Sequence, residues 1–237
     1  MKIIAGNWKM NGTRAMLTAM AAALADVKTD NTVIICPPYT LLWDMTGHLT
    51  LGAQDCSSEA KGAFTGEVSA EMIAANGAKY VIVGHSERRQ YHNETDEIVR
   101  KKAEQALAAN LTPIICVGEL ADEKDAGQTL AVIEKQLKGS VPTSLSALRS
   151  PLLIVAYEPR WAIGAGLTPT NDEIAAAHTH IAKVLNEMGL GGTPVLYGAS
   201  VKGSNAAEIM GIDGVDGVLV GGASLKPEDF IPIITAV

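Results

Sequence analysis

The chain of 237 residues is 47 % hydrophobic and only 4 % aromatic, so a folded core would consist mainly of aliphatic side chains. Its net charge of −7 argues against a nucleic-acid partner, because phosphate backbones attract clusters of lysine and arginine, although a small anionic substrate needs only local donors. Three isolated cysteines, no signal-peptide pattern and no apolar run of membrane length together predict a cytoplasmic protein without disulfides that does not enter a membrane.

Short apolar segments alternate with longer helical patterns from one end of the chain to the other. In chain order, the expected strands are residues 2–8, 32–38, 49–55, 80–85, 113–119, 151–158, 194–200 and 217–224. The expected helices that follow them are residues 13–27, a short one near 41, 69–77, 93–111, 125–140, 170–188, 204–212 and 226–237.

The expected strands are continuous apolar runs, which is typical of strands buried on both faces of a parallel sheet. Alternation of strands and helices gives either an open doubly wound sheet or a closed barrel. Eight strand–helix units in a chain of this length favour the barrel, and no linker or change of composition divides the sequence. We therefore expect an α/β fold, with residues 1–237 forming a single (β/α)8 barrel domain of eight parallel strands and outer helices.

Three of the expected strands end in polar residues. Asn7 and Lys9 are at the end of the first strand, His85 and Glu87 at the end of the fourth, and Glu158 at the end of the sixth. Taken singly, a lysine is usually solvated and a histidine is often structural, but a carboxylate beside an apolar strand is unfavourable unless it is paired or functional. Because the carboxyl ends of all barrel strands meet at one rim, where active sites lie, these residues together predict a catalytic site.

Glycine-rich turns follow the last two strands. In this fold the loops after the seventh and eighth strands commonly bind phosphate through backbone N–H groups. Gly221 and Gly222 would let the backbone approach a phosphate because they lack a Cβ atom. Gly164, in the loop after the sixth strand, would add an N–H group as that loop closes over the ligand. We therefore expect a small phosphorylated substrate.

Five motifs, in order along nearly the whole chain, resemble the triosephosphate isomerase family. They are GNWKMNG (6–12), VIVGHSERR (81–89), AYEPRWAIGAG (156–166), YGASVKGSNAAE (197–208) and VDGVLVGGASL (215–225). The resemblance implies a TIM barrel that interconverts dihydroxyacetone phosphate and D-glyceraldehyde 3-phosphate in glycolysis and gluconeogenesis. It also implies that no metal or organic cofactor takes part.

The resemblance assigns roles to individual residues. Glu158 would be the base that moves a proton between two substrate carbons, and His85 the electrophile that donates a hydrogen bond to the substrate oxygen. A glutamate base with a neutral histidine is a documented property of this family. Lys9, supported by Glu87, would supply positive charge, and Asn7 would help to position the substrate. The remaining substrate-binding residues would be Gly164, Ser200, Gly221 and Gly222.

The chemistry accounts for these residue types. A proton next to a carbonyl group is weakly acidic, so a carboxylate removes it only if the developing enediolate is stabilised by nearby donors. The same intermediate can eliminate phosphate, so water has to be excluded, which a closing loop does. Residues 159–161 and 167–169 would be the stiff hinges of that loop.

Three positions depart from the family pattern. Ala199 stands where the family usually has a glycine, and its Cβ restricts the positive φ values that a rearrangement there would require. Arg160 stands where an aliphatic residue is usual, and Ala165 where threonine is common. Arg160 either tunes the loop or is an exposed variable position.

A long polar loop over residues 53–69 follows the third strand. The resemblance implies that this loop projects into a second subunit of a homodimer, with Thr65 near the partner's site. Glu67 and Arg88 are candidates for an ion pair across that interface.

Several polar residues have structural interpretations. Glu119 is expected to support the fold, and His178 and His180, two positions apart on a helix, are expected to be surface residues. Two other functions stay open: isomerisation of a longer sugar phosphate, which needs a roomier pocket, and a catalytically weak phosphate-binding or assembly protein, which would normally lack Glu158 or His85.

Overall fold

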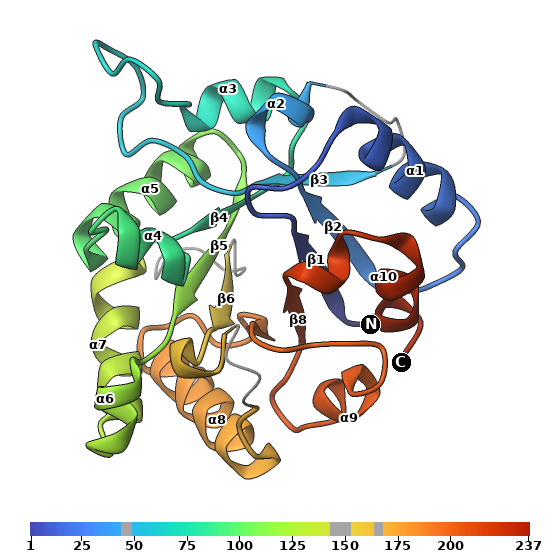
Figure 1. Ribbon diagram of the computed structural model, residues 1–237. Helices are drawn as coiled ribbons and strands as arrows, with labels where there is room; N and C mark the ends of the chain where they lie inside the picture. Colours follow the sequence, from blue (N-terminus) through green and yellow to red (C-terminus); the bar gives the residue numbers. More distant parts are fainter. Residues whose placement is uncertain (44–48, 143–152, 164–167) are drawn as a thin grey trace.

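The computed structural model describes residues 1–43, 49–142, 153–163 and 168–237. Eight parallel strands pair in sequence order and close into a barrel in which the first strand also pairs with the last (Figure 1). The strands are β1 (Ile3–Asn7), β2 (Thr32–Cys36), β3 (Thr50–Ala53), β4 (Tyr80–Val83), β5 (Thr112–Val117), β6 (Ile154–Tyr157), β7 (Val195–Tyr197) and β8 (Gly217–Val220). The predicted (β/α)8 barrel is confirmed.

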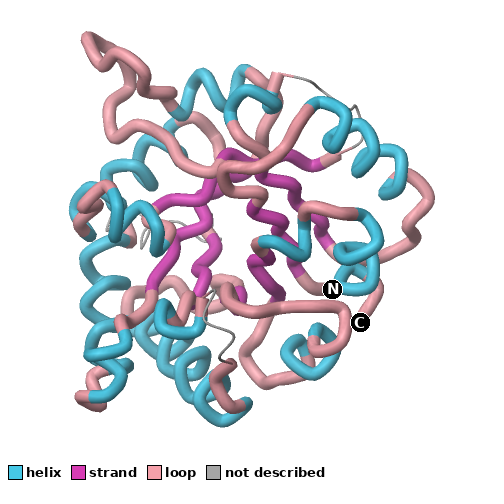
Figure 2. The backbone as a smooth tube through the Cα atoms, in the orientation of Figure 1, coloured by secondary structure: helices cyan, strands magenta, loops and turns pink. Residues whose placement is uncertain are grey.

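Helices surround the barrel on the outside (Figure 2). They are α1 (Arg14–Leu24), α2 (Tyr39–Leu42), α3 (Ala70–Ala75), α4 (Ser86–Tyr91), α5 (Asp96–Ala108), α6 (Ala121–Asp125), α7 (Thr129–Ser140), α8 (Asn171–Glu187), α9 (Ala206–Met210) and α10 (Pro227–Ile234), with 3-10 turns η2 (Arg160–Ala162) and η3 (Gly222–Ser224). The short helices α4 and α6 and both 3-10 turns were not among the expected elements, because they are too short to show a hydrophobic period and each unit that holds one already has a longer helix. No described helix has the length and apolar composition needed to span a membrane.

Local sequence determines where the predicted helices begin and end. The helix expected over residues 93–111 begins only at Asp96, because the hydroxyl of Thr95 accepts a hydrogen bond from the Ile98 amide and caps the helix. After α3 the chain turns at Gly77, whose φ of 83° is readily adopted by glycine, as expected for a residue that ends a helix.

The core has two layers, one inside the barrel and one between the strands and the helices. The inner layer consists of small and branched apolar side chains: Ala5, Ile34, Cys36, Ile82, Ile114, Cys116, Ile154, Ala156, Leu196 and Leu219. The outer layer holds the largest buried side chains, Trp8, Tyr197 and Phe230. A closely packed interior of this kind gives the strand ends fixed positions, which is what a catalytic rim requires.

The prediction that His178 is a surface residue is wrong. Residues two apart on a helix point to different faces, and His178 lies on the buried face of α8 with Ile174 and Ile181. Its Nδ1 lies 2.9 Å from the carbonyl oxygen of Gly214, which gives the buried ring a hydrogen-bond partner. His180, on the other face, is partly exposed.

Candidate active site

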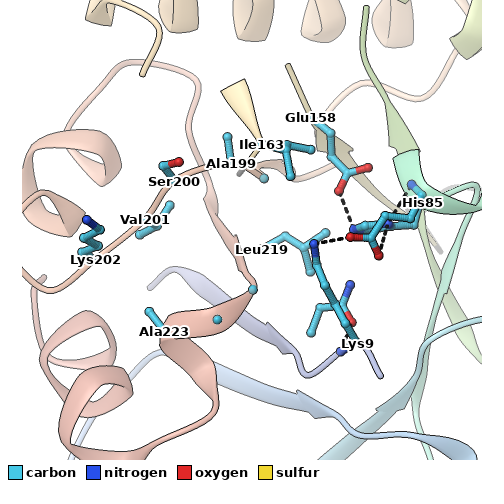
Figure 3. A pocket seen from close by; sticks show the side chains of 15 residues that line it. Lys9, His85, Glu158, Ile163, Ala199, Ser200, Val201, Lys202, Leu219 and Ala223 are labelled. Atoms are coloured by element: carbon cyan, nitrogen blue, oxygen red, sulfur yellow. Dashed lines mark hydrogen bonds and ion pairs between the residues drawn. The ribbon is translucent and has the colours of Figure 1, made fainter. Parts of the chain in front are cut away.

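Most of the predicted site residues line one cavity of about 430 Å³ at the carboxyl ends of the strands (Figure 3). The cavity is lined by Asn7, Lys9, His85, Glu87, Glu158, Ile163, Gly198, Ala199, Ser200, Val201, Lys202, Leu219, Gly221, Gly222 and Ala223. These residues lie in or after β1, β4, β6, β7 and β8, so strands that are far apart in the sequence contribute to one site.

The carboxylate of Glu158 is buried and accepts hydrogen bonds at both oxygens. Oε1 lies 2.9 Å from Nε2 of His85, and Oε2 accepts the backbone N–H of Ser86 at 2.8 Å. On the other side of the imidazole ring, Nδ1 of His85 accepts the backbone N–H of Glu87 at 3.2 Å. Since that N–H points at Nδ1, the proton of a neutral ring is on Nε2, where it is donated to Glu158 (Figure 3).

The surroundings of Glu158 favour its charged form. Burial by itself would raise the pKa of this carboxyl, because an ion is poorly solvated in the protein interior. The interaction with His85, the hydrogen bond from the Ser86 amide and the nearby Lys9 ammonium outweigh burial and lower the pKa below its ordinary value. Glu158 is therefore an ionised carboxylate that can accept a proton.

Lys9 is fixed at both its backbone and its ammonium group. Its φ of 53° is in the left-handed region, which is unusual for a residue with a side chain and is often associated with functional sites. The Asn7 side chain accepts the Lys9 N–H at 3.0 Å, and the Gln54 amide donates to the Lys9 carbonyl at 2.8 Å. Nζ lies 2.6 Å from Oε1 of Glu87, the contact that the resemblance led us to expect.

The loops after β7 and β8 form the opposite wall of the cavity (Figure 3). A Cβ atom built on Gly222 would meet no atom within 4 Å, so there is open space beside this residue. A Cβ on Gly221 would lie 3.5 Å from Cε of Lys9, which places the predicted phosphate loop next to the ammonium group. Ser200 also lines the cavity, and its hydroxyl donates to the carbonyl oxygen of Ala162 at 3.4 Å.

The two remaining predicted site residues, Gly164 and Thr65, are not among the described lining residues of this cavity, for different reasons. Gly164 lies outside the described residues, as do Ala165 and Leu167 of the expected loop and hinge. Thr65 is exposed, on the loop that projects from the barrel between β3 and α3 (Figure 1).

A family model for triosephosphate isomerase matches residues 2–237 of the chain. The triosephosphate isomerase of Rhizobium etli is 51 % identical over 246 aligned residues, which cover 99 % of this chain and 95 % of that protein. That of Acidiphilium cryptum is 48 % identical, with 99 % and 98 % covered. The chain belongs to the triosephosphate isomerase family.

A solved structure of the same family agrees with this assignment. The crystal structure of triosephosphate isomerase from Bartonella henselae matches with a TM-score of 0.87 at 38 % identity, and the match covers 99 % of this chain and 98 % of that one. The activity of this family is the interconversion of dihydroxyacetone phosphate and glyceraldehyde 3-phosphate, and this chain is an isomerase of that kind, acting in glycolysis and gluconeogenesis.

Three contributors to this candidate site were not identified from the sequence. They are the Ser86 backbone N–H, the Gln54 amide and Gly198, where a Cβ atom would come within 3.0 Å of Cγ of Glu158. A backbone N–H leaves no mark in a sequence, and Gly198 is one glycine of an expected turn. The sequence of a loop does not reveal which glycine is approached closely by another side chain.

The family departures are accommodated without backbone strain in the described residues. Ala199 does not have a positive φ, so its Cβ is tolerated in this conformation. Arg160 is partly buried, and one of its guanidinium nitrogens lies 3.5 Å from Oε1 of Gln90 on α4. Arg160 is therefore not simply an exposed position.

Glu119, expected to be structural, holds the residues that follow β6. Its Oε1 accepts hydrogen bonds from the Tyr157 hydroxyl at 3.2 Å and from the Trp161 indole at 2.8 Å. Within the part of the chain that the structure describes, no three His, Cys, Asp or Glu side chains are grouped so that they could hold a metal ion.

Proposed function

We propose that Glu158 and His85 carry out the proton transfer of the isomerisation, with Lys9 and Asn7 binding the substrate beside them. The observation that supports this most directly is the 2.9 Å contact inside the cavity between Nε2 of His85 and a buried carboxylate whose surroundings favour its charged form. These two groups are the acceptor and the donor that removal of a proton next to a carbonyl group requires.

The reaction begins when the carbonyl oxygen of dihydroxyacetone phosphate accepts the Nε2–H of His85 in place of Glu158. The freed carboxylate then takes a proton from the adjacent hydroxymethyl carbon. The carbon–hydrogen electron pair forms the double bond of an enediolate, whose oxygen is stabilised by His85 and Lys9. Transfer of the hydroxyl proton between the two oxygens, and return of the carbon proton from Glu158 to the former carbonyl carbon, gives glyceraldehyde 3-phosphate.

We propose that the phosphate group binds between Ser200 and the backbone of Gly221 and Gly222. The open space beside Gly222 and the nearby Lys9 ammonium support this position, because backbone N–H groups and a cation are the usual ligands of phosphate in this fold. Gly164 is expected to contribute a further N–H.

Substitution of the two catalytic residues tests the proposal. Glu158→Asp shortens the base, and His85→Gln replaces the imidazole, so we expect each to lower kcat with glyceraldehyde 3-phosphate by a factor of about 10² to 10⁴. Glu187→Asp, at an exposed position at the end of α8, is the matched control and should retain normal turnover. Wild-type turnover in a folded Glu158→Asp or His85→Gln protein, with folding checked by circular dichroism and Tm, contradicts the proposal.

We also propose that the protein is a cytoplasmic homodimer in which the loop over residues 53–69 contacts the partner. Exposed apolar side chains support an interface on this side of the molecule: Met10 is 97 % exposed, Tyr91 70 % and Phe64 44 %. A second cavity of about 360 Å³, lined by Lys9, Met10, Tyr91 and others, is large enough for side chains of a partner loop.

The expected ion pair between Glu67 and Arg88 has competing partners within the chain. Nε of Arg88 lies 2.9 Å from Asp55 and 2.6 Å from Glu94, and Glu67 accepts a hydrogen bond from Ser57. A contact across the interface would therefore use the terminal nitrogens of Arg88.

A further inference from the structure

Lys124, at the end of the short helix α6, contacts both flanks of the segment that follows the base. Its Nζ lies 3.4 Å from the centroid of the Trp161 ring, which places an ammonium group over the face of an indole. The same Nζ lies 3.1 Å from Oε1 of Glu173, in the first turn of α8. Trp161 comes three residues after Glu158, in η2, and α8 is the next helix along the chain (Figure 1). Lys124, from the preceding βα unit, thus contacts both η2 and α8, which the backbone connects only through residues 162–172.

The Trp161 ring is held at its edge as well as at its face. The indole N–H donates to Oε1 of Glu119 at 2.8 Å, and the backbone N–H of Arg160 donates to the carbonyl oxygen of Glu119 at 3.1 Å. Glu119 is buried, so it is a fixed anchor. Lys124 on the face and Glu119 at the edge together define the position of η2, because an ammonium over an aromatic face is attracted by the ring's negative quadrupole.

Glu173 can hold Lys124 and cap α8 at the same time. Its Oε2 accepts the backbone N–H of Thr170 at 2.8 Å and lies 3.1 Å from the Thr170 hydroxyl, so Oε1 is left for the ammonium group. The hydrogen bond from the Thr170 amide, followed by the contacts with Lys124 and the Thr170 hydroxyl, lowers the pKa of Glu173 in spite of slight burial. A carboxylate fixed in this way is a defined point to which Lys124 is attached.

We propose that Lys124 is a positioning residue for the isomerisation, which fixes η2 against α8 and so holds the backbone that carries Glu158. The proposal rests on the proposed role of Glu158 as the base. Pro159 restricts the backbone between Glu158 and η2, and the Arg160 N–H anchors the next residue, so a displacement of the Trp161 ring is transmitted to Glu158. Reacting groups have to be held within a fraction of an ångström, and small misplacements lower the rate of the chemical step.

A different role is open to a partly exposed lysine. The Lys124 side chain is 31 % exposed and that of Glu173 is 42 % exposed. Ion pairs at such exposed positions often make only a small contribution to the stability of the fold and none to catalysis. A merely stabilising contact would lower Tm on removal without changing turnover. The effect of removing Lys124 on kcat therefore distinguishes a positioning role from a merely stabilising one.

The test compares three variants of the full-length enzyme. Lys124→Met keeps the length of the side chain but removes the charge, and should lower kcat about threefold to tenfold with little change in KM. Lys124→Arg can keep both contacts and should retain kcat within about twofold of wild type. Lys138→Met is the matched control, because it removes an exposed lysine from a 2.5 Å ion pair with Glu134 on α7, and it should leave kcat unchanged.

A spectroscopic measurement follows the ring itself. Enzyme labelled with 5-fluorotryptophan contains three labelled residues, and the Trp161 signal in the ¹⁹F NMR spectrum is assigned with Trp161→Phe. Lys124→Met should shift or broaden this signal, whereas Lys138→Met should not.

Any of three results overturns the proposal. They are an unchanged Trp161 signal in Lys124→Met, a kcat for Lys124→Met equal to that of the control, and a loss of kcat that Lys124→Arg does not restore. If Glu158→Asp is inactive and Lys124→Met has the wild-type kcat, only the role of Lys124 is contradicted. If Glu158→Asp has the wild-type kcat, the proposed role of Glu158 as the base is contradicted.

Discussion

The position of the Glu158 carboxylate depends on a neighbour that has no side chain. Gly198, directly after β7, lies so close that a Cβ atom there would be 3.0 Å from Cγ of Glu158 and 3.3 Å from the carbonyl oxygen of Tyr157. The backbone oxygen cannot move without disturbing β6. The carboxylate would therefore have to shift if any other residue occupied this position.

Gly198→Ala should lower kcat roughly tenfold to a hundredfold, because the added methyl group displaces the base by a few tenths of an ångström or more. Steady-state kinetics with glyceraldehyde 3-phosphate checks this, with Tm measured to exclude misfolding. Gly222→Ala is a useful contrast, since its methyl group would enter the open space proposed for phosphate and should mainly raise KM. A Gly198→Ala enzyme with normal kcat would show that the carboxylate adapts without loss.

Single residues of the site were predictable to the extent that their chemistry is carried by a side chain at a strand end. Lys9, His85 and Glu158 stand out in the sequence because polar groups are unexpected beside buried strands. The Ser86 N–H and the close approach of Gly198 depend on how two loops meet in space, so no local pattern reveals them. The contacts of Lys124 with Trp161 and Glu173 could not be predicted either, since these partners are 37 and 49 residues away in the sequence.

Among the elements, α8 contains a buried group that makes stability depend on pH. His178 packs edge-on against the Tyr157 ring, with centroids 6.0 Å apart, and close to Tyr197. Burial lowers the pKa of His178 from 6.5 to about 4, although the Gly214 carbonyl and the charge of Asp216 act in the opposite direction. The folded protein therefore holds this ring neutral at pH values at which the unfolded chain binds a proton.

Acid should accordingly destabilise the protein through His178. Its contribution to stability is complete above pH 6.5 and is lost as the pH falls toward 4. Over that range the free energy of unfolding should fall by up to about 3 kcal/mol from this group alone. His178→Gln can still donate to Gly214 but does not titrate, so urea denaturation at pH 8 and pH 5 should give a smaller pH difference for the variant than for wild type. Equal differences would assign the acid sensitivity to other groups.

Helices were predictable where they are long enough to show a period, and α8 illustrates both the success and the limit. Its first turn is set by a capping box that the sequence displays, with Thr170 three residues before Glu173. Which of two histidines faces the core was not decided correctly, because the apolar stripe of this helix is broad and a neutral histidine is compatible with either side. His178 lies on the buried face with Ile174 and Ile181, and the carbonyl of Gly214 gives its ring a partner there.

At the scale of the whole molecule, the loop over residues 53–69 predicts that assembly and activity are linked. Thr65→Asp places a charge at the exposed tip that is proposed to contact the partner, and we expect sedimentation velocity to show a shift toward monomer. Turnover should fall roughly tenfold or more, because Lys9 would lose the partner loop that covers its side of the site. Thr179→Asp, on the exposed face of α8, is the control. A monomeric protein with full turnover would contradict the link.

The overall architecture was the most predictable feature, because it depends on a pattern repeated eight times rather than on any one residue. Errors of a few residues at the predicted strand ends do not alter the number of strand–helix units, and eight units favour a closed barrel over an open sheet. Register and the contacts between loops are set by the packing of side chains from different units, which is why the details of the site needed coordinates.

Closure of the barrel between β1 and β8 has a consequence for biosynthesis. Ile3 pairs with Gly217, so the strand that leaves the ribosome first keeps an unsatisfied edge until the last strand has been made. Lys9 and Gly221, which adjoin across this seam, come together only in the finished polypeptide. A chain that stops short of β8 would therefore expose an unpaired strand edge, which favours aggregation, and would lack the glycines that are proposed to bind phosphate.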